Sequence, residues 1–237
     1  MKIVIIGYGK MGKEIEKLAL QHGHEIILKI DLNNKKDFES EKFKQADVAI
    51  EFSNPENAYQ NILQCFKANI PVVSGTTGWM HDFEKAVKIC KSEDKTFFYA
   101  SNFSLGVNIF FRVNEYLAKI MDKYSDYKVH IEETHHTQKL DAPSGTAISL
   151  AKGVINNIGR LNKWEKENTQ NANSIPVVSF REGNVPGNHK VIYESPFDKI
   201  CIEHDAKSRQ GFAMGALLAA EFIQDKKGYF TMDDLIN

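Results

Sequence analysis

Along the first hundred residues, short continuous runs of apolar residues alternate with longer segments of a different pattern. In those longer segments, apolar residues recur every three or four positions, as in helices that bury one face. Repeated strand–helix units of this kind predict an α/β fold with a Rossmann-type doubly wound parallel sheet, which binds its ligands at the carboxyl ends of the strands. Short continuous apolar runs, typical of strands buried on both faces, lie at residues 3–6, 26–30, 48–52, 71–74 and 96–99.

After residue 104 the pattern predicts a different architecture. A helix over about 107–120 precedes an alternating strand at 127–132 and a helix at about 144–158. The polar, Asn-rich stretch 162–174 is interpreted as a mobile loop. Strands predicted at 177–180, 190–194 and 199–203 favour a mixed or antiparallel sheet, and a last helix covers 211–223. We therefore expect a dinucleotide-binding domain of residues 1–104 plus 211–237, with an inserted α+β domain of residues 105–210.

Composition and charge exclude several function classes. With 237 residues and 42% hydrophobic content, the chain is large enough for a folded enzyme. Its 30 basic and 31 acidic residues create no general field that would attract nucleic acid or an anionic membrane. The three cysteines are scattered and odd in number, which indicates reduced core thiols rather than a disulfide framework. The N-terminal apolar run is too short for a signal peptide or membrane span, so we expect a cytoplasmic protein.

A glycine-rich turn follows the first predicted strand and opens the first helix. It fits the G-x-G-x-x-G fingerprint of dinucleotide-binding proteins, in which the first glycine permits a tight turn, the second lets the backbone approach the pyrophosphate, and the third permits close helix–strand packing. An accidental glycine-rich turn is the alternative, but the strand–helix context favours the cofactor site. The predicted contact residues are Gly7, Tyr8, Gly9, Lys10, Met11 and Gly12.

Asp31 ends the second predicted strand and bears on the choice of cofactor. Its carboxylate can accept hydrogen bonds from the adenosine ribose and repel a 2′-phosphate, which favours NADH. An ordinary capping aspartate is the alternative interpretation. Lys35 and Lys36 lie close enough in sequence to compensate a 2′-phosphate, so NADPH stays open. We expect NADH or NADPH to serve, with NADH favoured or the two comparable.

Two more polar segments follow predicted strands and are candidates for the nicotinamide end of the cofactor. Their small polar residues can supply backbone and hydroxyl groups to the carboxamide and ribose, although uninteresting turns would look the same. The candidate residues are Gly75, Thr76 and Thr77, and Ala100, Ser101, Asn102 and Phe103.

The segment 133–147 carries the densest chemistry in the chain. His135 and His136 leave a predicted strand, Lys139 follows, and Ser144 is a candidate N-cap for the next helix. That helix start would present the free amides of Gly145 and Thr146, which together with paired cations can bind a dicarboxylate. His135 can exchange protons near neutral pH. Exposed strand-end histidines are the alternative; no third metal ligand stands at a usual spacing, so no metal is expected.

This segment resembles the signature of the 4-hydroxy-tetrahydrodipicolinate reductases, in the string H-H-x-x-K-x-D-A-P-S-G-T-A. The resemblance extends over most of the chain. It includes the N-terminal I-x-G-x-G-x-M-G, Glu51-Phe52-Ser53-x-Pro55, Gly75 to Gly78, Asn102-Phe103-Ser104-x-Gly106-Val107-Asn108, Arg181-Glu182-Gly183, and Ser208-Arg209.

The resemblance implies roles for these residues. His135 and Lys139 would be the catalytic proton donor/acceptor pair, His136 a substrate contact, and Gly145 with Thr146 the carboxylate clamp. The cofactor contacts would fall on Gly7 to Gly12, Asp31, Gly75 to Thr77 and Ala100 to Phe103. The implied reaction, in diaminopimelate/lysine biosynthesis, removes water from a cyclic hydroxy-imine dicarboxylate and reduces the conjugated imine with NAD(P)H. The resemblance also implies a homotetramer paired through the central sheet.

The chain departs from the family pattern in two places. The stretch before Asp47 is shorter than usual, and Leu32 stands where an arginine is often found, which weakens inference about NADPH. Two alternatives remain. Another two-domain Rossmann oxidoreductase, such as an aspartate or sugar dehydrogenase, would lack the long segment from His135 to Ala147. A non-catalytic NAD(H)-sensing module would leave His135 and Lys139 without a purpose and would need a partner surface or a DNA-binding segment.

Overall fold

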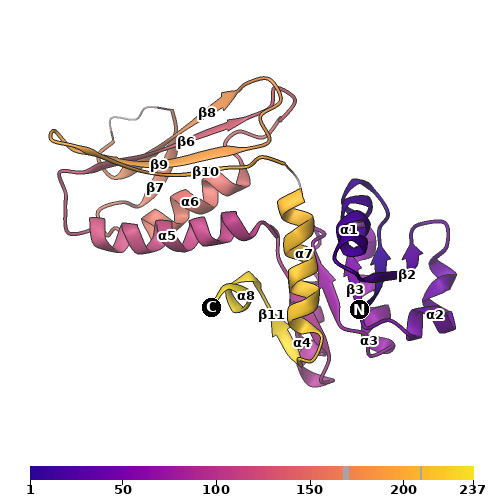
Figure 1. Ribbon diagram of the computed structural model, residues 1–237. Helices are drawn as coiled ribbons and strands as arrows, with labels where there is room; N and C mark the ends of the chain where they lie inside the picture. The colour runs from indigo at the N-terminus through magenta and orange to yellow at the C-terminus, as the bar shows by residue number, and fades with distance from the viewer. Residues whose placement is uncertain (168–170, 209) are drawn as a thin grey trace. The chain divides into compact units, whose positions relative to one another are not determined.

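The protein consists of two compact units, shown in the computed structural model of Figure 1. The structure describes residues 1–167, 171–208 and 210–237. Unit 1 is Met1–Leu105 with Gln210–Asn237, and unit 2 is Gly106–Arg209. The sequence predicts two domains, one of residues 1–104 with 211–237 and one of residues 105–210. Arg209, part of the family resemblance, and residues 168–170 of the expected loop lie outside the described residues.

Unit 1 is built on a parallel six-stranded sheet in the order β11-β5-β4-β3-β1-β2. This confirms the predicted doubly wound sheet. Its strands are β1 (Lys2–Ile6), β2 (Glu25–Ile30), β3 (Val48–Glu51), β4 (Val72–Ser74), β5 (Thr96–Tyr99) and β11 (Gly228–Phe230). Its helices are α1 (Lys10–Gln21), η1 (Lys35–Glu39), α2 (Glu41–Lys44), α3 (Pro55–Lys67), α4 (Phe83–Ser92), α7 (Gln210–Ile223) and α8 (Met232–Ile236).

Two hydrophobic cores lie on opposite faces of this sheet, as the continuous apolar runs predict. Ile3 and Ile5 of β1 join the core that α1 and α7 cover. Val4 and Ile6, which alternate with them, join the core formed with α3 and α4. Because successive side chains of a strand point to opposite faces, a strand covered on both sides must be apolar at every position. The glycine-rich turn and the other strand ends are thereby held at one edge of a rigid sheet.

Unit 2 contains a mixed five-stranded sheet in the order β10-β9-β6-β8-β7. β6 pairs in parallel with β8 and antiparallel with β9, which agrees with the expected mixed sheet. The strands are β6 (Lys128–His135), β7 (Lys163–Lys166), β8 (Ser174–Arg181), β9 (Asn188–Glu194) and β10 (Lys199–Asp205), and the helices are α5 (Leu105–Met121) and α6 (Gly145–Ile155).

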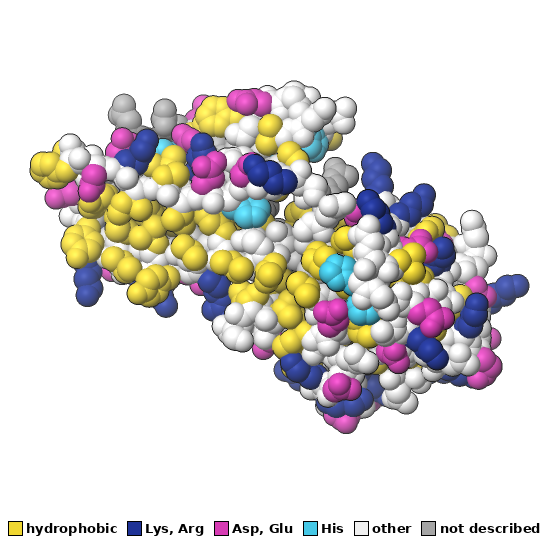
Figure 2. Space-filling view, in the orientation of Figure 1, with side chains coloured by type: hydrophobic (Ala, Val, Ile, Leu, Met, Phe, Trp, Pro, Cys, Tyr) yellow, Lys and Arg dark blue, Asp and Glu magenta, His cyan; other side chains and the backbone are white. Residues whose placement is uncertain are grey.

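The helices α5 and α6 share one hydrophobic core with the sheet of unit 2, and they lie on the same side of it in Figure 1. Residues of β6 alternate between buried and partly exposed, so the sheet has a buried face and an open face. Among the described residues, no helix covers the open face. Figure 2 shows hydrophobic side chains gathered along α5, whose outer face exposes Ile109, Val113, Tyr116 and Ile120.

Three expectations for unit 2 and the thiols need correction. The sequence pattern predicts a loop over 162–174, but this stretch contains β7, in which Lys163–Lys166 pairs in parallel with the start of β8. β6 continues past residue 132, so His135 is the last residue of the strand rather than part of the loop after it. Cys65 and Cys90 are buried free thiols, but Cys201 is exposed on β10 and is not a core residue. No helix among the described residues is long and apolar enough to cross a membrane.

Candidate functional site

The glycine-rich turn has the geometry that its sequence predicts. Gly7 has φ +89°, and a Cβ there would lie 2.2 Å from the carbonyl oxygen of Phe52. A Cβ on Gly12 would lie 2.3 Å from the Gly7 carbonyl oxygen, so α1 packs directly against the turn. A Cβ on Gly9 would meet nothing within 4 Å. The turn therefore needs Gly7 and Gly12 for its own shape, whereas Gly9 leaves space beside the backbone for a ligand.

The amino terminus of α1 is exposed beside this space. Gly9 is its N-cap and supplies no side-chain cap, and the first turn holds no acidic residue. Lys10 is exposed, and Met11 packs against the first core of unit 1. Uncapped N–H groups and the positive end of the helix dipole favour an anion at this position.

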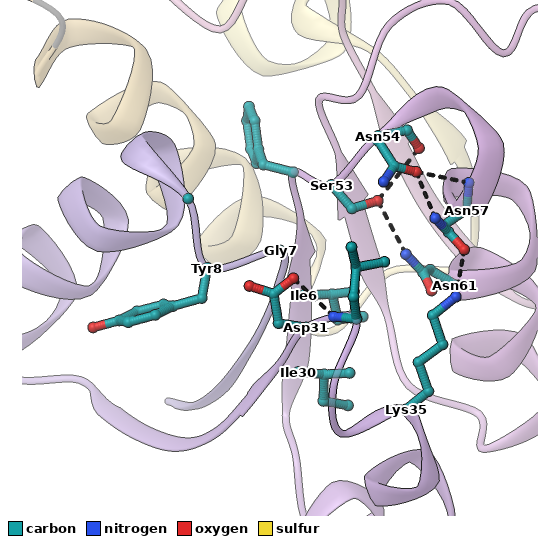
Figure 3. Close-up of a pocket in the computed structure, with 13 residues that line it drawn as sticks. Ile6, Gly7, Tyr8, Ile30, Asp31, Lys35, Ser53, Asn54, Asn57 and Asn61 are labelled. Atoms are coloured by element: carbon teal, nitrogen blue, oxygen red, sulfur yellow. Dashed lines mark hydrogen bonds between the residues drawn. The ribbon is translucent and has the colours of Figure 1, made fainter.

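A pocket of about 200 Å³ opens beside the turn. In Figure 3 the Asp31 carboxylate lies near Gly7, and Lys35 reaches toward α3. The backbone N–H of Leu32 donates to Asp31 Oδ1 at 2.8 Å, and Lys35 Nζ donates to Asn57 Oδ1 at 2.5 Å. The pocket is lined by Ile6, Gly7, Tyr8, Gly9, Ile30, Asp31, Leu32, Lys35, Phe52, Ser53, Asn54, Asn57 and Asn61.

Tyr8 extends from the turn toward α1 and β2. Its hydroxyl donates to Glu16, and Lys29 lies 4.6 Å above its ring centroid and 3.0 Å from Glu16. Hydrogen bonds from Tyr8 and Lys29 lower the pKa of Glu16. The ring is thus held in one orientation at the rim of the pocket.

A buried carboxylate organises the ends of β3 and β4. Glu51 is fully buried and accepts from the hydroxyls of Ser74 at 2.7 Å and Thr76 at 2.9 Å. The indole N–H of Trp79 donates to the Thr76 carbonyl. The side chain and carbonyl of Thr76 are therefore used inside the protein, whereas Thr77 is exposed at the strand end. The sequence alone did not reveal this role of Glu51.

The segment after β5 combines exposed and buried residues. Ser101 is exposed and Asn102 is half-buried. Ala100 is buried, and Phe103 is 2% exposed, packed against the rings of Phe52 and Phe98. A ligand contact at Phe103 would therefore have to use its backbone. Four of the predicted cofactor segments follow strands at the same edge of the sheet, as parallel strands require. They are the glycine-rich turn, Asp31, residues 75–77 and residues 100–103.

In unit 2, His135 ends β6 and is only 7% exposed. Its Nδ1 lies 2.5 Å from Oε2 of Glu133, whose side chain points to the same face of the strand two residues earlier. His136 is half-buried, and its carbonyl accepts from the Lys139 N–H. Lys139 pairs with the exposed Asp141 at 2.8 Å and lowers the pKa of that carboxyl. The predicted basic residues thus surround one strand end.

The start of α6 lies beside the same strand end. Ser144 is the N-cap, and its hydroxyl accepts from the Ala147 N–H at 3.2 Å, which confirms the predicted cap. Gly145 is exposed with open space beside its Cα, and Thr146 is half-buried. An N-terminus of this form can receive a carboxylate.

Three residues without a role in the sequence-based picture complete this cluster. Arg181 Nη2 lies 3.0 Å from Glu133 Oε1. His189 Nε2 lies 3.1 Å from the Ser144 hydroxyl, and its ring meets that of His135 edge-on at 5.0 Å. Burial lowers the pKa of His189 to about 4. The spacing of two residues between Glu133 and His135 predicts that both side chains lie on the same face of a strand. Arg181 and His189 are brought to this cluster only by strand pairing, which their sequence positions do not predict.

Comparisons with known proteins agree with both units. Residues 1–103 match the family model described as dihydrodipicolinate reductase, N-terminus, and residues 106–236 match that of its C-terminus. The chain belongs to the dihydrodipicolinate reductase family. A 4-hydroxy-tetrahydrodipicolinate reductase of Christiangramia forsetii is 52% identical over 239 residues, covering 100% of this chain and 98% of the relative. One from Staphylococcus saprophyticus is 34% identical and covers 99% of this chain and 100% of its own.

A solved member of the dihydrodipicolinate reductase family has the same fold. The dipicolinate-bound enzyme from Paenisporosarcina sp. TG-14 superposes with a TM-score of 0.78 at 21% identity, covering 100% of both chains. Family membership argues against the alternatives of an aspartate or sugar dehydrogenase and of a sensing module.

Proposed function

We propose that this protein reduces 4-hydroxy-tetrahydrodipicolinate to tetrahydrodipicolinate in diaminopimelate/lysine biosynthesis. Water leaves the substrate, a hydride and a proton are added, and NAD(P)H becomes NAD(P)⁺. The observation that carries the proposal is the strand end at His135, which runs through Lys139 into the capped start of α6 in a chain of this family. It combines a proton-exchanging group, a cation and an anion site, which the reduction of a dicarboxylate imine requires.

In this proposal the residues of unit 2 hold the substrate and move the proton. The backbone amides of Gly145 and Thr146, together with the Thr146 hydroxyl, receive one carboxylate at the positive end of α6. His136 and Lys139 provide further contacts to the anion, in competition with Asp141. His135, with Lys139, delivers the proton that accompanies hydride addition.

The cofactor site of the proposed enzyme is the turn, the pocket and the neighbouring strand ends of unit 1. A bound reduced nicotinamide supplies the hydride. Gly9 leaves room for the pyrophosphate at the start of α1, and Asp31 accepts from the adenosine ribose. Polar side chains at the nicotinamide end come from Thr77, Ser101 and Asn102. Backbone groups come from Gly75, Thr76, Ala100 and Phe103.

We further propose that NADH is favoured or that both cofactors are used comparably. The Asp31 carboxylate repels a 2′-phosphate, and Leu32 cannot compensate it. Lys35 lines the pocket but already donates to Asn57. An NADPH preference above about tenfold in kcat/KM, or about 1.4 kcal/mol, would contradict this proposal.

One assay tests the reaction. The purified protein is incubated with enzymatically generated 4-hydroxy-tetrahydrodipicolinate, and oxidation of NADH and NADPH is followed by absorbance. We expect oxidation only when that substrate is present. Oxidation coupled instead to oxaloacetate with ammonia, or to a sugar ketone, would support a different dehydrogenase, and cofactor binding without any turnover would support the sensing module.

Two further proposals follow from the family resemblance. We propose a homotetramer that assembles through the open face of the unit 2 sheet, since a sheet face that exposes Phe180 and Cys201 gains from being covered. We also propose a cytoplasmic location, because the reaction draws on the pool of reduced nicotinamide cofactor.

A further inference from the structure

The carboxylate of Glu133 is held at a single place by groups from three elements. Its side chain is 0% exposed on β6. Oε2 lies 2.5 Å from His135 Nδ1 and Oε1 lies 3.0 Å from Arg181 Nη2 at the end of β8. The Ser144 N–H at the start of α6 donates to Oε1 at 3.3 Å. A buried side chain with contacts on both oxygens has little freedom to rotate.

These contacts keep Glu133 ionised. Burial by itself raises the pKa of a carboxyl, but the contacts with His135, Ser179 and Arg181 outweigh burial and hold the pKa of Glu133 well below its ordinary value. A permanent negative charge therefore faces one nitrogen of a histidine that is itself almost fully buried.

We infer that Glu133 is a positioning residue of the proposed reductase, which fixes His135 with its Nδ1 proton toward the carboxylate and so leaves Nε2 to exchange protons. The inference rests on the proposed function for the role of His135. A neutral imidazole has one donor and one acceptor nitrogen, and the partner of one nitrogen decides the state of the other. A carboxylate accepts only, so it selects the tautomer protonated on Nδ1.

The surroundings of Nε2 are consistent with that assignment. A Cβ on Gly187 would come within 3.1 Å of His135 Nε2, so the glycine keeps space open beside this nitrogen. The Gly187 backbone lies just before β9, whose His189 is bonded to the Ser144 cap. The same cluster therefore orients the proton-exchanging ring and ties it to the start of α6.

A metal ion is the competing interpretation. Among residues 1–167, 171–208 and 210–237, Glu133, His135 and His189 each offer a ligand atom, all within 4.8 Å of one another. Arg181 already supplies a positive charge to Glu133, however. Two ligands of a tetrahedral zinc ion, each at about 2.0 Å, lie about 3.3 Å apart, whereas Nδ1 and Oε2 are 2.5 Å apart. That separation is too short for two ligands of one zinc ion.

The test uses the full-length enzyme and its Glu133→Gln variant. Glutamine keeps the volume and can still accept from Arg181, but its NH₂ group can donate to Nδ1 and so select the other tautomer. We expect kcat to fall by about 10²-fold or more, as when a carboxylate partner of a catalytic histidine becomes an amide. The substrate KM and the NADH Kd should stay within about threefold of wild type.

The matched control is Glu132→Gln. Glu132 is the preceding residue of the same strand, points to the open face of the sheet, and lies 3.8 Å from His130. Its kcat should equal that of wild type, which separates the effect of Glu133 from a general loss of charge on β6.

A spectroscopic measurement does not depend on the variant folding well. In ¹⁵N solid-state NMR of ring-labelled histidine at about pH 8.5, where free imidazole is neutral, wild-type His135 should be protonated on Nδ1. Its signal is identified by its absence in His135→Gln. Protonation on Nε2 in wild type would overturn the inference, as would a Glu133→Gln kcat within threefold of wild type. So would one equivalent of zinc per chain that Glu133→Gln loses.

The proposed function fails separately, if wild type does not oxidise NADH with 4-hydroxy-tetrahydrodipicolinate. The Nδ1 measurement then still decides whether Glu133 sets the tautomer of His135.

Discussion

At the scale of single residues, the chemistry of the proposed enzyme is concentrated at one strand end. His135 is buried and in contact with Glu133, whereas Lys139 is partly exposed and paired with Asp141. The two basic side chains therefore meet different surroundings. The buried ring of His135 is held in one orientation, which suits it to exchange protons with a bound substrate. The lysine lies on a loop, so its side chain can move to contact an anionic substrate.

Replacing either basic residue should impair the chemical step. We expect His135→Ala and Lys139→Ala each to lower kcat by roughly 10²- to 10⁴-fold, the usual scale of general acid–base catalysis. NADH affinity should stay near wild type, because neither side chain belongs to the dinucleotide site. Since residues that act as one unit are not additive, the double variant should resemble the poorer single one. Steady-state kinetics at saturating substrate check this; near-normal kcat in one variant would remove that residue from the chemistry.

Thr146 should act on substrate binding alone. We expect Thr146→Val to raise KM for the dicarboxylate and barely to change the Kd for NADH, because the lost hydroxyl belongs to the start of α6. Kinetics and a fluorescence titration of NADH give the two constants. A larger effect on the cofactor than on the substrate would contradict this assignment.

The stability of unit 2 should decrease with acid because of His189. Burial holds its pKa at about 4, against an ordinary value of 6.5, so the unfolded chain binds a proton that the folded protein excludes. The contribution of neutral His189 to the free energy of unfolding is thus complete above pH 6.5. It is lost as pH falls toward 4, by up to about 3 kcal/mol. Below the ordinary value of 4.5, protonation of the carboxyl of Glu133 in the unfolded chain adds to the loss.

Melting temperatures measured between pH 7.5 and 4.5 test this. His189→Gln should have a lower Tm at pH 7.5 but a shallower decline toward acid. The exposed His22→Gln serves as the control and should follow wild type. Parallel curves for wild type and His189→Gln would show that His189 does not titrate as argued.

At the scale of elements, the turn from β1 to α1 separates two uses of glycine. Gly12 is required by packing, since a Cβ would lie 2.3 Å from backbone, whereas Gly9 is not, since nothing lies within 4 Å. Sequence identifies all three glycines of the fingerprint but does not distinguish these uses. Only the approach of the helix to the strand does.

The two glycines should therefore respond differently to alanine. Gly12→Ala should destabilise unit 1 by about 1–3 kcal/mol through overpacking. Gly9→Ala should fold normally but bind NADH and NADPH about equally more weakly, because its methyl group occupies the place of the pyrophosphate. Thermal unfolding and cofactor titration measure the two effects. Unchanged titrations for Gly9→Ala would contradict the cofactor site.

At the scale of the whole molecule, the sheet of unit 2 has one face covered by α5 and α6 and one open face. On the open face, Val178 of β8 lies opposite Glu132 of β6 in the strand register. If tetramers form through this face, light scattering should give a mass about four times 26.9 kDa. Val178→Lys should reduce the mass by placing a charge in the interface, without changing NADH binding by unit 1. A wild-type mass of one chain would contradict the tetramer.

Much of the fold and part of the candidate site could be predicted from local sequence. Continuous apolar runs predict parallel strands, because a strand buried on both faces must be apolar at every position. The N-cap at Ser144 is predictable because it depends only on the residues next to it in sequence. The strand β7 was missed because its four residues alternate too weakly to outweigh the surrounding polar stretch. The extension of β6 to His135 was missed because pairing with β8 and β9, and not its own composition, keeps it extended.

The sequence by itself therefore determined the parallel sheet of unit 1, the glycine-rich turn and the basic segment from His135 to Thr146, since each depends on residues close together in the chain. Only the tertiary structure decided what surrounds His135. Arg181 reaches Glu133 from 48 residues away because β8 pairs with β6, and His189 joins them because β9 pairs with the other edge of β6. Strand pairing brings together groups that no sequence spacing relates. The contacts it creates hold the pKa of Glu133 low against the effect of burial, and the burial it creates lowers the pKa of His189.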